Sequence, residues 1–159
     1  MRSVNMIVAF IGSDNYTRST HTAIQMWGVL GKLVVEEGAN IFLFNNANFF
    51  DNDCLLIVSQ LKMHHPHIER HYHHGVFDYD IGYVEYMKEK YDKVFFPRIG
   101  FPLREHLRNR QMIDKCDVLI TYCNNDELLS EQKSQTVRAI EYAQEKKKRV
   151  INLRCDSVD

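Results

Sequence analysis

The segment Met6-Ile-Val-Ala-Phe-Ile-Gly12 determines the class of fold, because every residue from 6 to 11 is apolar and the run ends in glycine. Continuous apolar runs of this length are typical of strands buried on both faces of a parallel sheet, whereas a strand with one wet face alternates apolar and polar residues. We therefore predict a central strand here. The glycine marks its end and the start of a loop.

Outward from this segment, strands and helices alternate. Residues 20–37 carry apolar side chains at helical spacing and stop at Gly38, and the apolar run 41–44 has the length of a strand. The same patterns predict strands at 68–73, 93–96, 117–123 and 150–153, and helices at 50–63, 80–91, 102–113 and 133–146. Helices that join parallel strands cover both faces of the sheet. We predict a single α/β domain over 1–159, doubly wound, mostly parallel and Rossmann-like.

Composition and charge narrow the class of protein. The chain has 159 residues, 45% of them apolar and 26% charged, which are ordinary values for a globular domain. A formal net charge of −1 provides no general attraction to nucleic acid or to an acidic membrane. No apolar run reaches the ~18 residues of a membrane span, and the four cysteines are irregularly spaced. We expect a cytoplasmic protein whose partner is a small molecule.

Two loops are the first candidates for a ligand site, because doubly wound sheets bind ligands beyond the carboxyl ends of their strands. In the first loop, Gly12 lets the backbone approach a ligand, and the hydroxyl groups of Ser13 and Thr17 can donate to it. In the second loop, Asn45 and Asn46 tolerate a left-handed backbone. Their N–H groups are therefore expected to point outward as an anion-binding nest.

Charged and aromatic side chains extend this candidate site. Asp51, after the second loop, either caps the next helix or accepts hydrogen bonds from a ribose. Arg104 and Arg108 are one helical turn apart and can clamp a phosphate, although a solvated helix face explains the same pattern. The ring of Tyr16 or Phe49 is expected to stack on a planar ligand.

Six of the eight histidines lie between residues 64 and 74. On a strand, His71 and His73 would project to the same face, a spacing that can bind zinc or nickel. A polar edge segment explains the cluster without any ion. We expect no metal and assign no certain cofactor.

Several segments taken in order resemble the SLOG superfamily, most closely its YpsA-like branch: Lys62-Met-His-His-Pro-His-Ile68, Arg108-Asn-Arg-Gln-Met-Ile-Asp114, Gln135-Thr-Val-Arg-Ala-Ile-Glu141 and Val150-Ile-Asn-Leu153. The resemblance implies a Rossmann-like protein that binds a nucleotide or nucleotide derivative and forms homo-oligomers. It also implies a pocket lined by Gly12, Ser13, Asn45, Asn46, Asp51, Arg108, Asn109 and Thr136.

The chain departs from the LOG phosphoribohydrolases of that superfamily. Their Gly-Gly-x-Gly-Thr-x-x-Glu loop corresponds to 130–139, which contains no glycine, and the catalytic glutamate falls at Arg138 or Ala139. The leading hypothesis is therefore a nucleotide-binding, regulatory or sensing protein rather than an enzyme. One alternative is a hydrolase or transferase acting on N-glycosidic bonds, with Glu141 or Asp51 as its carboxylate. A second alternative is a protein-interaction module with a degenerate pocket.

Overall fold

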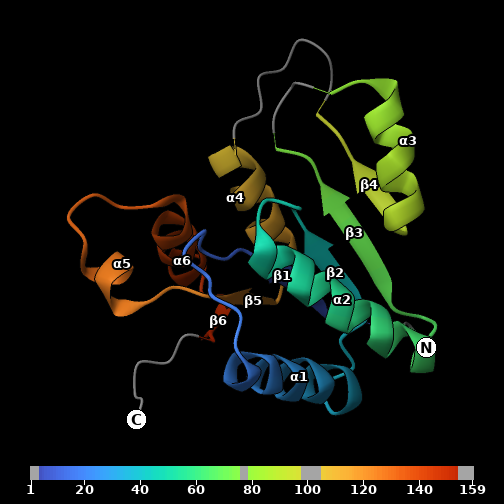
Figure 1. Cartoon of the computed structure of the whole chain (residues 1–159), viewed down its shortest axis with the longest axis horizontal. Coiled ribbons are helices and arrows are strands. Elements are labelled where there is room, and N and C mark those ends of the chain that lie inside the picture. Colours follow the sequence, from blue (N-terminus) through green and yellow to red (C-terminus); the bar gives the residue numbers. More distant parts are fainter. Residues whose placement is uncertain (1–3, 76–78, 98–104, 154–159) are drawn as a thin grey trace.

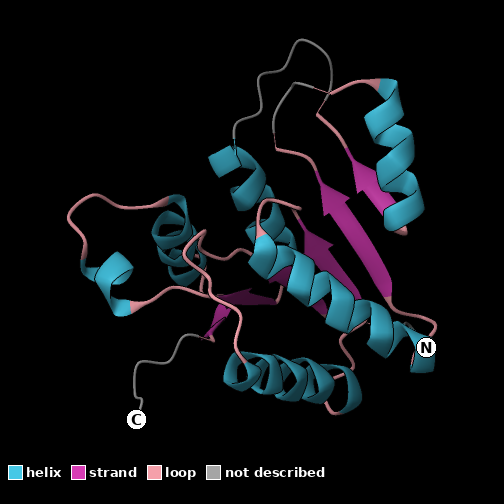
Figure 2. Cartoon of the chain, in the orientation of Figure 1, coloured by secondary structure: helices cyan, strands magenta, loops and turns pink. Residues whose placement is uncertain are grey.

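The computed structural model describes residues 4–75, 79–97 and 105–153, in which strands and helices alternate (Figures 1 and 2). The strands are Ile7–Phe10 (β1), Ile41–Phe44 (β2), Glu69–His73 (β3), Lys93–Phe95 (β4), Val118–Thr121 (β5) and Arg149–Asn152 (β6). The helices are Thr20–Val35 (α1), Phe49–His64 (α2), Ile81–Lys90 (α3), Glu105–Lys115 (α4), Asn125–Leu129 (α5) and Gln135–Glu145 (α6). All predicted elements are confirmed. The short α5 was not predicted, and the predicted helix start at 102 lies outside the described residues.

The strands form one sheet in the order β4-β3-β2-β1-β5-β6, and every neighbouring pair is parallel. The chain builds outward from β1 to β4, then crosses back to place β5 on the other side of β1. This is the doubly wound, Rossmann-like architecture, and the sheet is wholly rather than mostly parallel. The reversal beside β1 is the topological switch point, where such sheets bind ligands.

Both faces of the sheet are covered, as the apolar pattern of β1 requires. Val8 and Phe10 point into a core shared with α1 and α2, while Ala9 and Ile11 point into a second core shared with α4 and α6. The first core is rich in stacked aromatic rings, with the Phe10 centroid 4.9 Å from that of Phe44. None of the described helices is long and apolar enough to cross a membrane.

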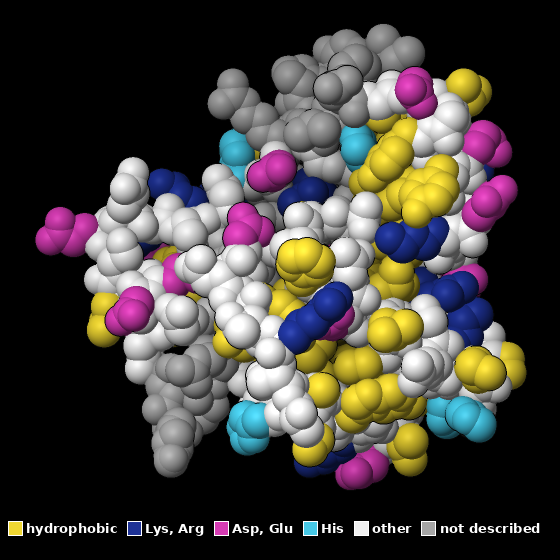
Figure 3. Space-filling view, viewed as in Figure 1, with side chains coloured by type: hydrophobic (Ala, Val, Ile, Leu, Met, Phe, Trp, Pro, Cys, Tyr) yellow, Lys and Arg dark blue, Asp and Glu magenta, His cyan; other side chains and the backbone are white. Residues whose placement is uncertain are grey.

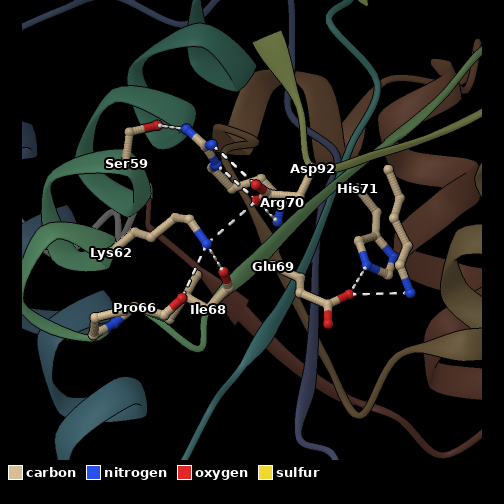
Figure 4. Close-up of polar contacts among 9 residues, drawn as sticks. Ser59, Lys62, Pro66, Ile68, Glu69, Arg70, His71 and Asp92 are labelled. Carbon is tan, nitrogen blue, oxygen red and sulfur yellow. Dashed lines mark hydrogen bonds and ion pairs between the residues drawn. The ribbon is translucent and has the colours of Figure 1, made fainter. Parts of the chain in front are cut away.

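The motif Lys62-x-x-x-Pro66-x-Ile68 connects α2 to β3 (Figure 4). The Lys62 ammonium group donates to the carbonyl oxygens of Pro66 and Ile68, and it lies 3.7 Å from the Asp92 carboxylate. Arg70 pairs with the same carboxylate at 3.0 Å. These contacts lie at the start of β3, at the end of the sheet opposite the switch point. The motif therefore has a structural role, which is to fasten the end of α2 to the start of β3.

The helix α5 differs from the other helices because none of its residues is buried. Its Leu129 side chain is exposed. The described helices other than α5 each bury at least one side chain. The segment that carries α5 is therefore held to the domain mainly by its two ends and by polar contacts.

Gly12 is predicted to be essential for packing. A Cβ atom at this position would lie 2.2 Å from the ring of the fully buried Phe50, so Gly12→Ala should lower the free energy of unfolding by about 1–3 kcal/mol. Gly28→Ala, in α1, is the matched control: its added methyl meets nothing within 4 Å and should stabilise the helix by up to about 1 kcal/mol. Urea denaturation of both variants would check the opposite signs, and equal effects would contradict this packing.

Candidate functional site

A cleft with a volume of about 370 Å³ lies at the switch point. Its walls come from the loops that follow β1 and β2, from the first turns of α4 and α6, and from α5. The lining residues are Ile11, Gly12, Ser13, Asp14, Asn15, Asn45, Ala47, Asn48, Glu105, Arg108, Asn109, Glu127, Ser134, Gln135 and Thr136. The cleft has the size of a small-molecule site.

Most of the residues predicted to bind a ligand meet in this cleft, namely Gly12, Ser13, Asn45, Arg108, Asn109 and Thr136. They come from widely separated parts of the sequence. Thr17, Asn46 and Asp51 are not among the lining residues. The fold therefore unites the first loop, the asparagine turn and the arginine-bearing helix, and their role in binding stays a prediction.

Arg108 is the one basic residue among the described residues that line the cleft, and the acidic residues Asp14, Glu105 and Glu127 line it as well. The Arg108 side chain is 6% exposed, and its Nε and Nη2 atoms donate to Asn109 Oδ1 at 3.2 and 3.1 Å. Burial lowers its pKa, but a guanidinium group stays protonated at physiological pH. No carboxylate of the described residues lies within 4 Å of it, and its predicted partner Arg104 falls outside them. Arg108 is thus a buried cation that forms no ion pair with a described residue, although the charges of Glu105 and Asp51 act on it from a longer distance.

Gly75 makes room for this arginine. A Cβ atom on Gly75 would lie 2.5 Å from Arg108 Nη1, so that a larger residue after β3 would displace the guanidinium group. Gly75 was not recognised from the sequence as a site residue. It follows a histidine-rich segment, and no local pattern indicated that an arginine more than thirty residues later packs on it.

The asparagine turn after β2 differs from the prediction in one respect. Asn46 has a φ of 53°, which confirms the left-handed backbone. However, the N–H groups of Asn45 and Asn46 donate to the carboxylate of Asp51, at 3.1 and 2.7 Å. The nest exists, but this side chain of the protein occupies it, so it is not open to a ligand. The prediction of an outward-facing nest was wrong.

Asp51 is consequently an internal group. It is 1% exposed, and burial raises its pKa to about 6, against the opposing effect of the two N–H donors. Asn48, not Asp51, provides the cap of α2 by accepting from the Asp51 N–H. Asp51 therefore does not line the cleft, and its structural role is to tie the turn to the helix.

Glu127 lines the cleft beside the start of α6, and sequence analysis did not identify it as a site residue. Ser134 Oγ caps α6 by accepting from the Val137 N–H, and it donates to Glu127 Oε2. The other oxygen, Glu127 Oε1, is buried with no hydrogen-bond donor in the part of the chain described. The N–H groups of Gln135 and Thr136 belong to the first turn and have no acceptor within the helix. The loop after β5 was an expected site, but nothing in its sequence distinguished Glu127 from its acidic neighbours.

Other predicted residues lie elsewhere. Glu141 faces a separate groove, where both of its carboxylate oxygens contact Lys133. Thr17 is exposed and donates to the Asn15 carbonyl at 3.4 Å. The Tyr16 hydroxyl donates to Asp53 at 2.8 Å, and the exposed Phe49 ring lies beneath Arg18, so neither ring lines the cleft.

The two candidate metal ligands share one face of β3 as predicted. His71 pairs with Glu69 at 2.8 Å, while the His73 ring stacks on Phe95 with centroids 4.8 Å apart. Burial lowers the pKa of His73 to about 3, so this side chain is neutral at physiological pH. Among the described residues, no group of three side chains is arranged to hold a metal ion.

The ionisation of Asp51 predicts a pH dependence of stability. The pKa of Asp51 is about 6 in the folded protein, against the ordinary 3.8, because burial disfavours the ionised carboxylate. The folded state is therefore most stable when Asp51 is protonated. This stabilisation is complete below pH 4 and is lost as the pH rises through 6. The difference between these two pKa values corresponds to about 3 kcal/mol in the free energy of unfolding. The free energy of unfolding of the wild type, relative to that of Asp51→Asn, should therefore fall between pH 4 and pH 8. Urea titrations across this range measure it, and a constant difference would show that Asp51 does not titrate as expected.

Comparison with known proteins identifies the fold but no family. No protein-family model and no curated protein sequence matches the chain. Solved structures do match it, including two of the molybdenum cofactor carrier protein of Chlamydomonas reinhardtii. One has 13% identity and a TM-score of 0.54, and covers 92% of this chain and 75% of that one. The other has 11% identity and a TM-score of 0.55, and covers 97% and 79%. At such low identity, the likeness shows a shared Rossmann-like fold.

Proposed function

We propose that this protein binds a nucleotide or nucleotide derivative in the switch-point cleft, with a phosphate group held by Arg108. The observation that carries the proposal is the burial of this guanidinium group with no ion pair within 4 Å among the described residues, the charges of Glu105 and Asp51 acting only from farther away. A buried charge is costly unless an opposite charge accompanies it. An anionic ligand supplies that charge, and the flat, forked guanidinium group suits the oxygens of a phosphate.

The first turn of α6 supports the same assignment. Gln135 and Thr136 line the cleft with N–H groups that lack helical acceptors, and the positive end of the helix dipole lies there. Glu127 is placed to accept a hydrogen bond from a sugar hydroxyl, since its Oε1 has no donor among the described residues. The cleft thus offers donors for a phosphate beside an acceptor for a ribose.

Motif order and the Rossmann-like fold support a family assignment. We infer that the chain is a divergent member of the SLOG superfamily, closest to the YpsA-like branch, in which binding is retained without certain catalysis. The solved neighbours support ligand binding in general, because they carry a molybdenum cofactor. That cofactor therefore belongs among the ligands to be tested.

A second candidate function is cleavage or transfer at an N-glycosidic bond. Glu127 is the observation in its favour, because it places a carboxylate in the cleft where Glu141 and Asp51 do not. A third candidate is an interaction module with an empty pocket. Exposed apolar side chains over α1 and α2 supply a surface for it or for self-association, among them Ile24, Leu56 and Met63 (Figure 3). Homo-oligomer formation and cytoplasmic location stay predictions.

The variant Arg108→Gln is expected to bind the ligand more weakly while still folding. Nucleoside monophosphates, nucleosides and the molybdenum cofactor should be titrated by calorimetry into the wild type and into Arg108→Gln. Loss of a charge-assisted contact of about 1.5–3 kcal/mol predicts a tenfold or greater loss of affinity for the phosphorylated ligand. Arg149→Gln is the matched control, because that exposed arginine pairs with Glu37 away from the cleft. Equal affinities in all three proteins would contradict the proposal.

The same variant also tests whether Arg108 contributes to the stability of the fold. Because the Arg108 guanidinium group is buried and forms no ion pair with a described residue, Arg108→Gln should leave the free energy of unfolding unchanged or raise it. Chemical denaturation without ligand measures this. A large loss of stability would instead indicate that Arg108 serves the fold.

Incubation of the wild type with nucleoside monophosphates tests the enzymatic candidate. Under the binding proposal, chromatography detects no free base. Release of base that is abolished in Glu127→Gln would replace the binding proposal with N-glycosidic cleavage.

A further inference from the structure

We propose that a second anion subsite lies in the groove between α4 and α6, and that the ligand is therefore a nucleotide with at least two linked phosphates. The inference rests on the proposed function of the cleft and specifies its ligand class. It covers nucleoside diphosphates and compounds esterified on the second phosphate, such as dinucleotides.

The groove is a continuous surface formed by two packed helices. It has a volume of about 450 Å³. His106 and Arg110 from α4 face Gln135, Arg138 and Tyr142 from α6 across it. Positions 106 and 110, and positions 135, 138 and 142, are three or four residues apart, so each set forms one face of its helix. Ala139 also lines the groove, and its small side chain leaves space there.

The groove and the cleft share part of their walls. Asn109 and Gln135 line both of them. Asn109 is also the residue whose Oδ1 accepts from Arg108. A ligand whose first phosphate contacts Arg108 and the start of α6 therefore has a direct path past Gln135 into the groove.

The spacing suits linked phosphates. Arg138 lies three residues beyond Gln135, which corresponds to about 5 Å along the helix axis. A diphosphate group can bridge a step of this size. A ligand with one phosphate would contact the cleft but leave the groove unfilled.

The charge of the groove favours an anion. Lys133 and Glu141 neutralise each other through an ion pair of 2.9 Å. Arg110 stacks on the Tyr142 ring at 4.9 Å, and neither it nor Arg138 forms an ion pair with any described residue. Two arginines therefore remain available, against the single unpaired carboxylate of Glu145 in the groove wall.

The test compares ligands that differ only in phosphate number. Phosphate and pyrophosphate, together with AMP and ADP, should be titrated by calorimetry into the wild type, into Arg110→Gln/Arg138→Gln and into Arg149→Gln. We expect the wild type to bind the diphosphate member of each pair at least tenfold more tightly. The double variant should lose that preference while keeping its affinity for the monophosphate member. Arg149→Gln should behave like the wild type.

The outcomes separate this inference from the proposed function. If the monophosphates bind through Arg108 but the second phosphate adds no affinity, the groove subsite is wrong and the cleft stands. If the double variant weakens both members of a pair equally, the arginines act on the cleft and the subsite is again wrong. If no member of either pair binds the wild type, both the proposed function and the subsite fail. Both arginines are exposed, so thermal unfolding of the double variant should match that of the wild type.

Discussion

The position of β1 between β2 and β5 is the constraint on which the architecture and the cleft both depend. A strand that is paired on both edges and covered on both faces must be wholly apolar, as the residues of β1 are. The chain must also cross from one side of β1 to the other, because β2, β3 and β4 lie on one side of it and β5 and β6 on the other. That crossing separates the loops after β1 and β5, and the space between them becomes the cleft.

The fold was predictable because its determinants are local. The apolar runs, their lengths and the helical spacing between them fall within windows of a few residues. Most of the cleft was predictable too, because the carboxyl ends of parallel strands meet at one end of a sheet. Gly12, Ser13 and Asn45 were located in this way, whereas Asn109 and Thr136 were expected from the resemblance to the SLOG superfamily, and Arg108 from that resemblance and from its spacing to Arg104.

The incorrect or missing parts all depend on contacts between side chains distant in space. The Asn45–Asn46 turn has the predicted backbone, but only coordinates reveal that the Asp51 carboxylate fills it. Gly12 lines the cleft, and its role in close approach to a ligand stays a prediction, but its packing against the ring of Phe50 was not foreseen. Glu127 belongs to the site through its contact with Ser134, a contact that no spacing in the sequence indicates.

None of the side chains of α5 is buried, so this wall of the cleft is only weakly attached to the domain. Since α5 contributes nothing to either apolar core, displacing it exposes little apolar surface and leaves the sheet intact. The wall that carries Glu127 can thus fluctuate on its own, while the wall that carries Arg108 is anchored by α4. If the cleft binds the ligand that we propose, entry and exit of that ligand would be governed by the opening rate of one small segment, independently of the global unfolding rate.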